Sequence, residues 1–81
     1  MNALTLRARR NQIHLRLVAY HPSLYPMPDD HLRVVVQVVS HGRPIAEDPI
    51  HIESMPTLQL ARVIHQSRME GWDITPWEKS H

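Results

Sequence analysis

Residues 32–40 carry the sequence LRVVVQVVS, in which the β-branched residue valine dominates. Such residues favour an extended strand, and successive side chains of a strand point to opposite faces. One face is then wholly apolar, with Leu32, Val34, Val36 and Val38. The other is half polar, with Arg33, Val35, Gln37 and Val39. We therefore predict a strand over residues 32–40 with its apolar face buried.

The same alternation runs from Leu4 to Tyr20, which predicts strands over residues 3–9 and 12–20. The apolar positions change parity between Arg9 and Gln12, where Asn11 tolerates a left-handed backbone. Either a hairpin or one long strand with a bulge explains this change. We favour the hairpin.

A turn at residues 41–44, His-Gly-Arg-Pro, leads from strand 32–40 into a returning strand over residues 44–53. Pro49 has no amide donor, so this strand belongs at an edge of the sheet. Pro22, Pro26 and Pro28 mark the preceding segment as a stiff connecting loop.

A helix is predicted over residues 56–70, because Pro56 is tolerated in a first turn and Gly71 is typical of a helix end. Ser54 and Thr57 are the candidate caps for the exposed first-turn amides. Its apolar side, expected to lie on the sheet, comprises Leu60, Ala61, Val63, Ile64 and Ser67. Trp72 and Trp77 then suggest a docked segment, and residues 78–81 a frayed tail.

These elements predict a single α+β domain over residues 1–81: a small antiparallel sheet of three to four strands with one amphipathic helix packed on one face. The order of the strands stays open, because the proline loop allows the second hairpin to lie on either side of the first.

The composition argues against catalysis. With no Cys among its 81 residues the chain has no disulfide, thiolate nucleophile or Cys-based zinc site. Its seven His residues lack the local spacing of a metal site, and its two Gly residues form no phosphate-binding loop. We expect a protein that is not an enzyme, with no catalytic residues, no metal and no cofactor.

The start of the chain lacks the pattern of a secretory signal, and no apolar run approaches the roughly 20 residues that a membrane span needs. We therefore expect a cytoplasmic protein without a membrane partner.

Positive charge is concentrated at the start of the sequence. Residues 1–28 contain four Arg and no acid, whereas residues 29–81 contain five basic and eight acidic residues. Arginine binds phosphate in bidentate fashion, which makes Arg7, Arg9, Arg10 and Arg16 candidates for binding nucleic acid. A net charge of only +1 and a lack of aromatic side chains beside these arginines weaken this hypothesis.

The hypothesis that we favour from sequence is protein recognition through the helix, by Leu58, Arg62 and Met69, which fall on its polar side. The alternatives are that Leu58 packs under the first turn or that a Trp covers Met69. If this surface binds a protein, the chain is a small adaptor or inhibitor, as are accessory proteins of phages and mobile elements that block larger machines. An exposed sheet edge also offers pairing with a second copy, as in a homodimer.

Overall fold

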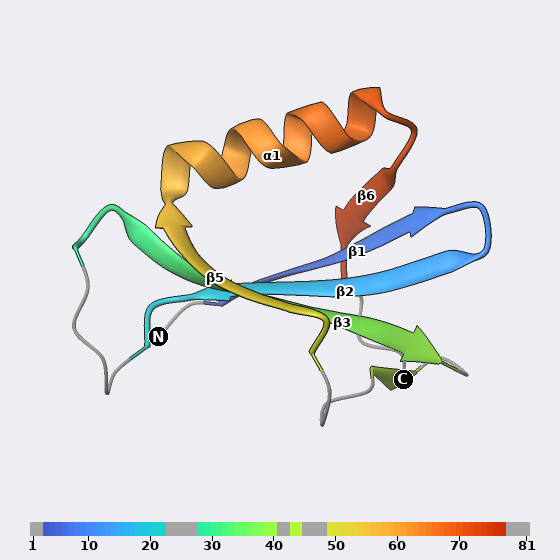
Figure 1. The fold of residues 1–81 in the computed structure, drawn as a ribbon, viewed down its shortest axis with the longest axis horizontal. Coiled ribbons are helices and arrows are strands. Elements are labelled where there is room, and N and C mark those ends of the chain that lie inside the picture. Colours follow the sequence, from blue (N-terminus) through green and yellow to red (C-terminus); the bar gives the residue numbers. More distant parts are fainter. Residues whose placement is uncertain (1–2, 23–27, 41–42, 45–48, 78–81) are drawn as a thin grey trace.

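The computed structural model describes residues 3–22, 28–40, 43–44 and 49–77, which form an antiparallel sheet with one helix on one face (Figure 1). The elements are β1 (Leu4–Arg10), β2 (Ile13–Tyr20), β3 (His31–Ser40), β4 (Arg43–Pro44), β5 (His51–Pro56), α1 (Thr57–Met69) and β6 (Asp73–Pro76). The predicted α+β class is confirmed.

The sheet has five main strands in the order β5-β3-β2-β1-β6, with the two-residue β4 beside the end of β3. The predicted count of three to four strands is wrong because the segment after Gly71 forms a strand, β6. It pairs with β1 and places Ile74 opposite Ala8. β6 lies at the sheet edge, where Pro76 costs no pairing on its free side.

The first two strands form a hairpin and not one bulged strand. Arg10 pairs with Ile13, so Asn11 and Gln12 make the turn. Asn11 has a φ of 56°, a left-handed conformation that asparagine tolerates better than most residues. This hairpin brings the arginines of β1 and β2 side by side.

The returning strand differs from the predicted span of residues 44–53, because it is divided into β4 and β5. β4 places Pro44 opposite Val39, whereas β5 places His51 opposite Val36. Seven positions separate the two residues on the returning side and three separate their partners, so one continuous ladder cannot join them. Pro49, without an amide donor, lies in the interruption.

The helix begins one residue later than predicted, at Thr57, while Pro56 ends β5. No side chain caps its first turn. Instead the Thr57 amide and hydroxyl both donate to the Asp30 carbonyl, at 2.6 and 3.1 Å. This neighbouring backbone oxygen therefore does the work expected of Ser54 or Thr57 as a cap.

The helix ends at Met69 and Gly71 follows with a φ of 102°. The Gly71 amide donates to the Arg68 carbonyl at 3.1 Å, and the Trp72 amide donates to the Ser67 carbonyl at 3.0 Å. This pair of bonds is a Schellman motif, which satisfies carbonyls that the helix leaves unpaired.

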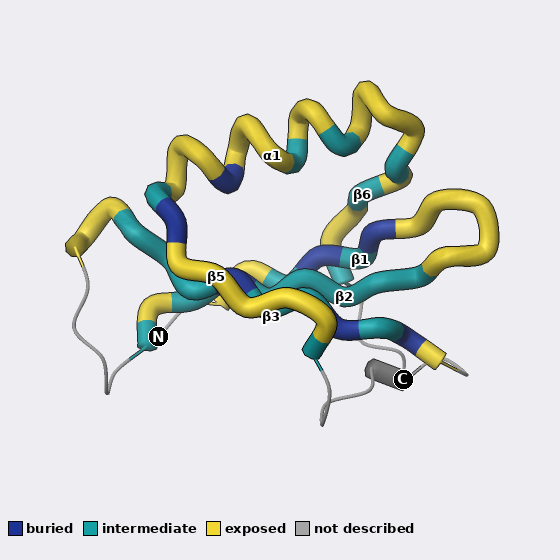
Figure 2. The backbone as a smooth tube through the Cα atoms, in the orientation of Figure 1, coloured by how far each residue is buried: buried dark blue, intermediate teal, exposed yellow. Residues whose placement is uncertain are grey.

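The core lies between the first half of α1 and the sheet (Figure 2). Its buried members are Ala19, Val34, Met55 and Leu60, against which Leu17, Leu32, Val36 and Ile64 pack. The helix buries a narrower stripe than predicted, since Ala61 is exposed and Val63 is 42% exposed. Under its second half an apolar hollow of about 240 Å³ separates Ser67 and Trp72 from the sheet.

Candidate nucleic-acid interface

The sheet face opposite α1 carries a row of cationic side chains on β1, β2 and β3. The helix lies on the other face of the sheet (Figure 1). Gln37 and Val39 of β3, on the same face as the arginines, are buried. Arg7 on β1 lies directly opposite Arg16 on β2, and Arg16 lies opposite Gln37 on β3. Directly opposed side chains on one face lie about 5 Å apart at Cβ. The two guanidinium groups are therefore neighbours; we call Arg7, Arg9 and Arg16 the arginine cluster.

Arg9 joins this cluster from the next position of β1 on the same face, opposite His14 and Asp73. Arg33 shares the face from β3, where it lies opposite Tyr20. Among the described strand residues of this face, Asp73 is the one carboxylate, and no described carboxylate forms an ion pair with the arginine cluster. The described strand residues of this face therefore carry a net positive charge, which attracts anions.

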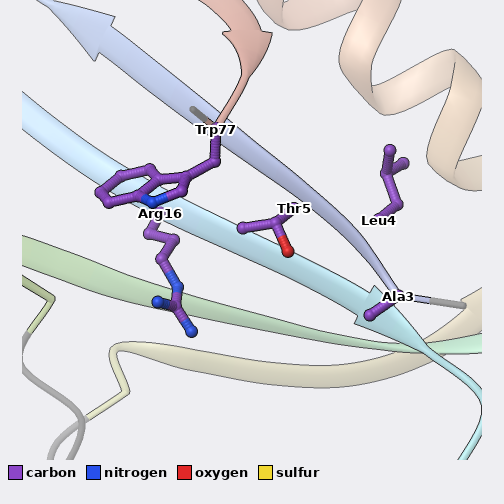
Figure 3. Close-up of a pocket in the computed structure, with 5 residues that line it drawn as sticks. All are labelled: Ala3, Leu4, Thr5, Arg16 and Trp77. Carbon is purple, nitrogen blue, oxygen red and sulfur yellow. The ribbon is translucent and has the colours of Figure 1, made fainter. Parts of the chain in front are cut away.

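An aromatic ring lies among these arginines. Trp77 follows β6 and continues its pairing with β1, because its amide donates to the Thr5 carbonyl at 2.9 Å. The guanidinium carbons of Arg7 and Arg16 lie 4.6 and 5.8 Å from the centroid of its ring. Figure 3 shows Trp77 and Arg16. These distances are typical of cation–π contacts, which hold the indole and the two cations together.

His14 completes the group, with its ring centroid 6.1 Å from that of Trp77. Burial, and then the positive charges of Arg7 and Arg9, lower the pKa of His14 below its ordinary value. His14 is therefore neutral at pH 7. In the described part of the chain the Nε atoms of Arg7 and Arg16 and the Nε2 atom of His14 are buried without a hydrogen-bond partner.

Two hollows border the arginine cluster. The larger, of about 610 Å³, is lined by Ala3, Leu4, Thr5, Arg16 and Trp77 (Figure 3). The smaller, of about 250 Å³, is lined by Arg7, Arg9, Thr75 and Pro76. Both volumes lie near or within the range of roughly 300–1,000 Å³ that is usual for ligand pockets. The aromatic ring thus borders one hollow and two arginines border the other.

Arg10 does not belong to the cluster, although the sequence grouped it with Arg7, Arg9 and Arg16. It directly follows Arg9 on β1, so its side chain lies on the opposite face, which α1 covers. A Cβ atom at Gly71 would lie 3.7 Å from the Arg10 Nε, which places this cation at the carboxyl end of the helix. There it complements the negative end of the helix dipole.

Alternation along the first strands places His14 on the face of the arginines, but Trp77 and Arg33 were not expected there. The expectation that no aromatic side chain lies beside the arginines is wrong. The signal was the alternation Asp73, Thr75, Trp77, which places Trp77 on the arginine face once residues 73–76 are recognised as a strand paired with β1.

The helix residues that the sequence proposed for protein recognition are all exposed. Leu58 is 62% exposed and Met69 is 72% exposed, so neither lies under a helical turn or under a Trp. Leu58, Arg62 and Met69 form a stripe on the side of α1 opposite the buried Leu60. This stripe is separate from the arginine cluster, because α1 lies on the other face of the sheet (Figure 1).

Within the described ranges, no group of three or more His, Cys, Asp or Glu side chains is arranged to hold a metal ion. The helix found there is also too short and too polar to cross a membrane. Comparison with models of protein families, with curated proteins and with solved structures gave no match.

Proposed function

We propose that the protein binds nucleic acid on the sheet face that carries the arginine cluster and Trp77. The observation that carries this proposal is the Trp77 ring within cation–π distance of two guanidinium groups, neither of which has a carboxylate partner among the described residues. Arginine contacts phosphates through paired N–H donors, and aromatic rings stack on bases. The face combines both kinds of contact on neighbouring strands.

The arrangement of charge supports the same proposal. Like charges directly opposite each other on a sheet destabilise it, and Arg7 faces Arg16 in this way. A bound phosphate supplies the opposite charge that the protein side lacks. The small net charge of +1 weighs less here than in the sequence alone, because Asp73 is the one carboxylate among the described strand residues of this face.

The test is fluorescence anisotropy of labelled DNA and RNA oligonucleotides at several salt concentrations. We expect affinity to fall with salt, and the double variant Arg7→Gln/Arg16→Gln to reduce the slope of log K against log salt by about 0.7–0.9 for each arginine removed. The control is Arg10→Gln/Arg62→Gln, which removes the same charge from outside this face.

Two outcomes would contradict this proposal. The first is no binding of any oligonucleotide at low salt. The second is an equal loss of affinity in both double variants, since that would reflect net charge rather than a site. Circular dichroism of each variant checks that the sheet is intact.

The second candidate function is protein recognition by the exposed helix stripe of Leu58, Arg62 and Met69, with the protein acting as an adaptor or inhibitor. The supporting observation is the exposure of Leu58 and Met69, at 62% and 72%, since exposed Met and Arg are typical of interfaces. Leu58→Asp and Met69→Asp should then abolish partner capture by the immobilised protein without unfolding it. Capture that is unchanged in both variants would rule out this surface.

A further inference from the structure

We infer that the ligand is a single strand, one base of which stacks on Trp77 in the larger hollow while the adjoining phosphates contact the arginine cluster. This inference rests on the proposed function and adds to it the state of the nucleic acid and the position of one base. It names no sequence preference, because stacking on an indole suits every base.

Stacking on the Trp77 ring requires an unpaired base. Trp77 is half-buried at the edge of the sheet, and it borders a hollow of about 610 Å³ together with Thr5 and Arg16. In a duplex each base is paired and stacked on its neighbours, so its face is not available to a protein ring. An unpaired base can place its face on the indole, and this favours a single strand.

Cationic side chains and a hydroxyl lie next to the Trp77 ring on the same face of the sheet. The smaller hollow is lined by Arg7, Arg9 and Thr75. Thr75 lies two residues before Trp77, and Arg7 and Arg9 lie two and four residues after Thr5, which bonds to Trp77. The hollow therefore presents cations and a hydroxyl next to the aromatic ring. A single strand alternates bases with phosphates, and a basic surface with an interleaved aromatic ring matches that alternation.

The arginine cluster lies on the face of a continuous sheet and not on a helix or a free ribbon. Reading a duplex requires an element that enters a groove, such as a helix or a free two-stranded ribbon. β1 and β2 do not form a free ribbon, because β6 pairs with β1 and β3 pairs with β2 (Figure 1). The helix lies on the opposite side of the sheet. A sheet face of this kind suits a strand laid across it.

The experiment compares three labelled probes of about twelve nucleotides, within the usual site size for single strands. They are a mixed-sequence single strand, its duplex, and an abasic strand that keeps the phosphates but lacks the bases. Deoxy and ribo versions of the first probe assign the source as DNA or RNA; tighter binding of either supports the inference. We expect the single strand to bind more tightly than both the duplex and the abasic strand.

The matched variants are Trp77→Leu, which keeps apolar bulk but removes the aromatic face, and Trp77→Phe, which keeps a ring. Trp77→Leu should weaken binding of the single strand by roughly 5- to 150-fold and leave the abasic strand unaffected, whereas Trp77→Phe should retain most of the affinity. The control is Trp72→Leu, on the helix side of the sheet, which should leave the affinities for all probes unchanged.

Tryptophan fluorescence provides a readout that does not depend on substituting Trp77, which keeps the test valid if Trp77 variants fail to fold. In Trp72→Phe the sole tryptophan is Trp77, and a base stacked on it quenches its fluorescence. The single strand should quench this emission and the abasic strand should not.

The inference fails, with the proposed function intact, if the duplex or the abasic strand binds as tightly as the single strand or if Trp77 emission does not respond. If no probe binds, the proposed function fails as well.

Discussion

The guanidinium carbon of Arg7 lies 4.6 Å from the centroid of the Trp77 ring, so that side chains from two ends of the sequence meet on one face of the sheet. Arg7 comes from β1, and Trp77 from the segment that follows β6. The backbone bond between Trp77 and Thr5 fixes the same register. The contact therefore belongs to the folded sheet and is present before any ligand binds.

This contact predicts an energetic coupling between the two residues. In a double-mutant cycle of Arg7→Met and Trp77→Leu, we expect a coupling of about 0.5–1 kcal/mol in the free energy of unfolding, the usual value of a cation–π pair at a partly exposed site. Urea denaturation measures it. The control cycle of Arg10→Met with Trp77→Leu should give no coupling, because Arg10 lies on the helix side. Equal coupling in both cycles would contradict the assignment.

His14 predicts a dependence of stability on pH. Because its pKa is lowered in the folded protein by burial and by Arg7 and Arg9, the unfolded chain binds this proton more readily than the folded one. The contribution of His14 therefore favours folding above its unfolded pKa of about 6.5, and stability is lost as the pH falls through that value toward the lower folded pKa.

The measurement is urea denaturation between neutral and mildly acidic pH, with His14→Gln as the comparison. This variant removes the proton site, so its free energy of unfolding should fall less on acidification than that of the wild type. His65→Gln, an exposed position on α1, is the control and should follow the wild type. A steeper fall in His14→Gln would reverse the sign and refute this explanation.

Leu58 and Leu60 are two positions apart on α1 and lie on opposite sides of the helix. Leu60 is 3% exposed and Leu58 is 62% exposed. We expect Leu60→Ala to lower the free energy of unfolding by about 2–5 kcal/mol, because it leaves a cavity between helix and sheet. Leu58→Ala should change it by no more than about 0.5 kcal/mol. Thermal unfolding of both variants tests this; similar losses would mean that α1 packs through another face.

The apolar hollow beneath the second half of α1 predicts a stabilising substitution. Ser67 lines this space of about 240 Å³ together with Val63 and Trp72. Ser67→Leu should raise the free energy of unfolding by about 0.5–2 kcal/mol, since it fills apolar space and improves helix propensity. Ser67→Ala, which raises helix propensity without filling the space, controls for propensity alone. A destabilised Ser67→Leu would show that the hollow cannot accept the larger side chain.

Local patterns in the sequence account for the hairpin, for β3 and for the end of the helix, because each depends on residues close together in the chain. Alternation between Leu4 and Tyr20 and the left-handed preferences of Asn11 and Gly71 are of this kind. β6 was missed because four residues ending in a proline carry little strand signal. These residues form a strand because they pair with the free edge of β1, about seventy positions away in the sequence.

The site shows the same division. The shared face of Arg7, Arg9 and Arg16 follows from alternation along each strand and was predicted. Arg10 was grouped with them from its position in the sequence, but it lies on the other face, because neighbours on a strand point apart. The alternation Asp73, Thr75, Trp77 places these residues on one face of a strand, but no pattern near residue 77 indicates that this strand pairs with β1 and brings Trp77 to the cluster.

The pairing of β6 with β1 also bears on how quickly the protein folds. Leu6 pairs with Pro76, so this edge forms only when the two ends of the described chain meet. In sequence, β2, β3, β5 and α1 lie between them. Contacts between residues so distant in sequence carry a loop-closure entropy that slows folding. The β1–β2 hairpin closes through a two-residue turn, whereas the contact of Trp77 with the arginines joins residues about 70 positions apart. We therefore expect the complete basic and aromatic face to form later in folding than the hairpin.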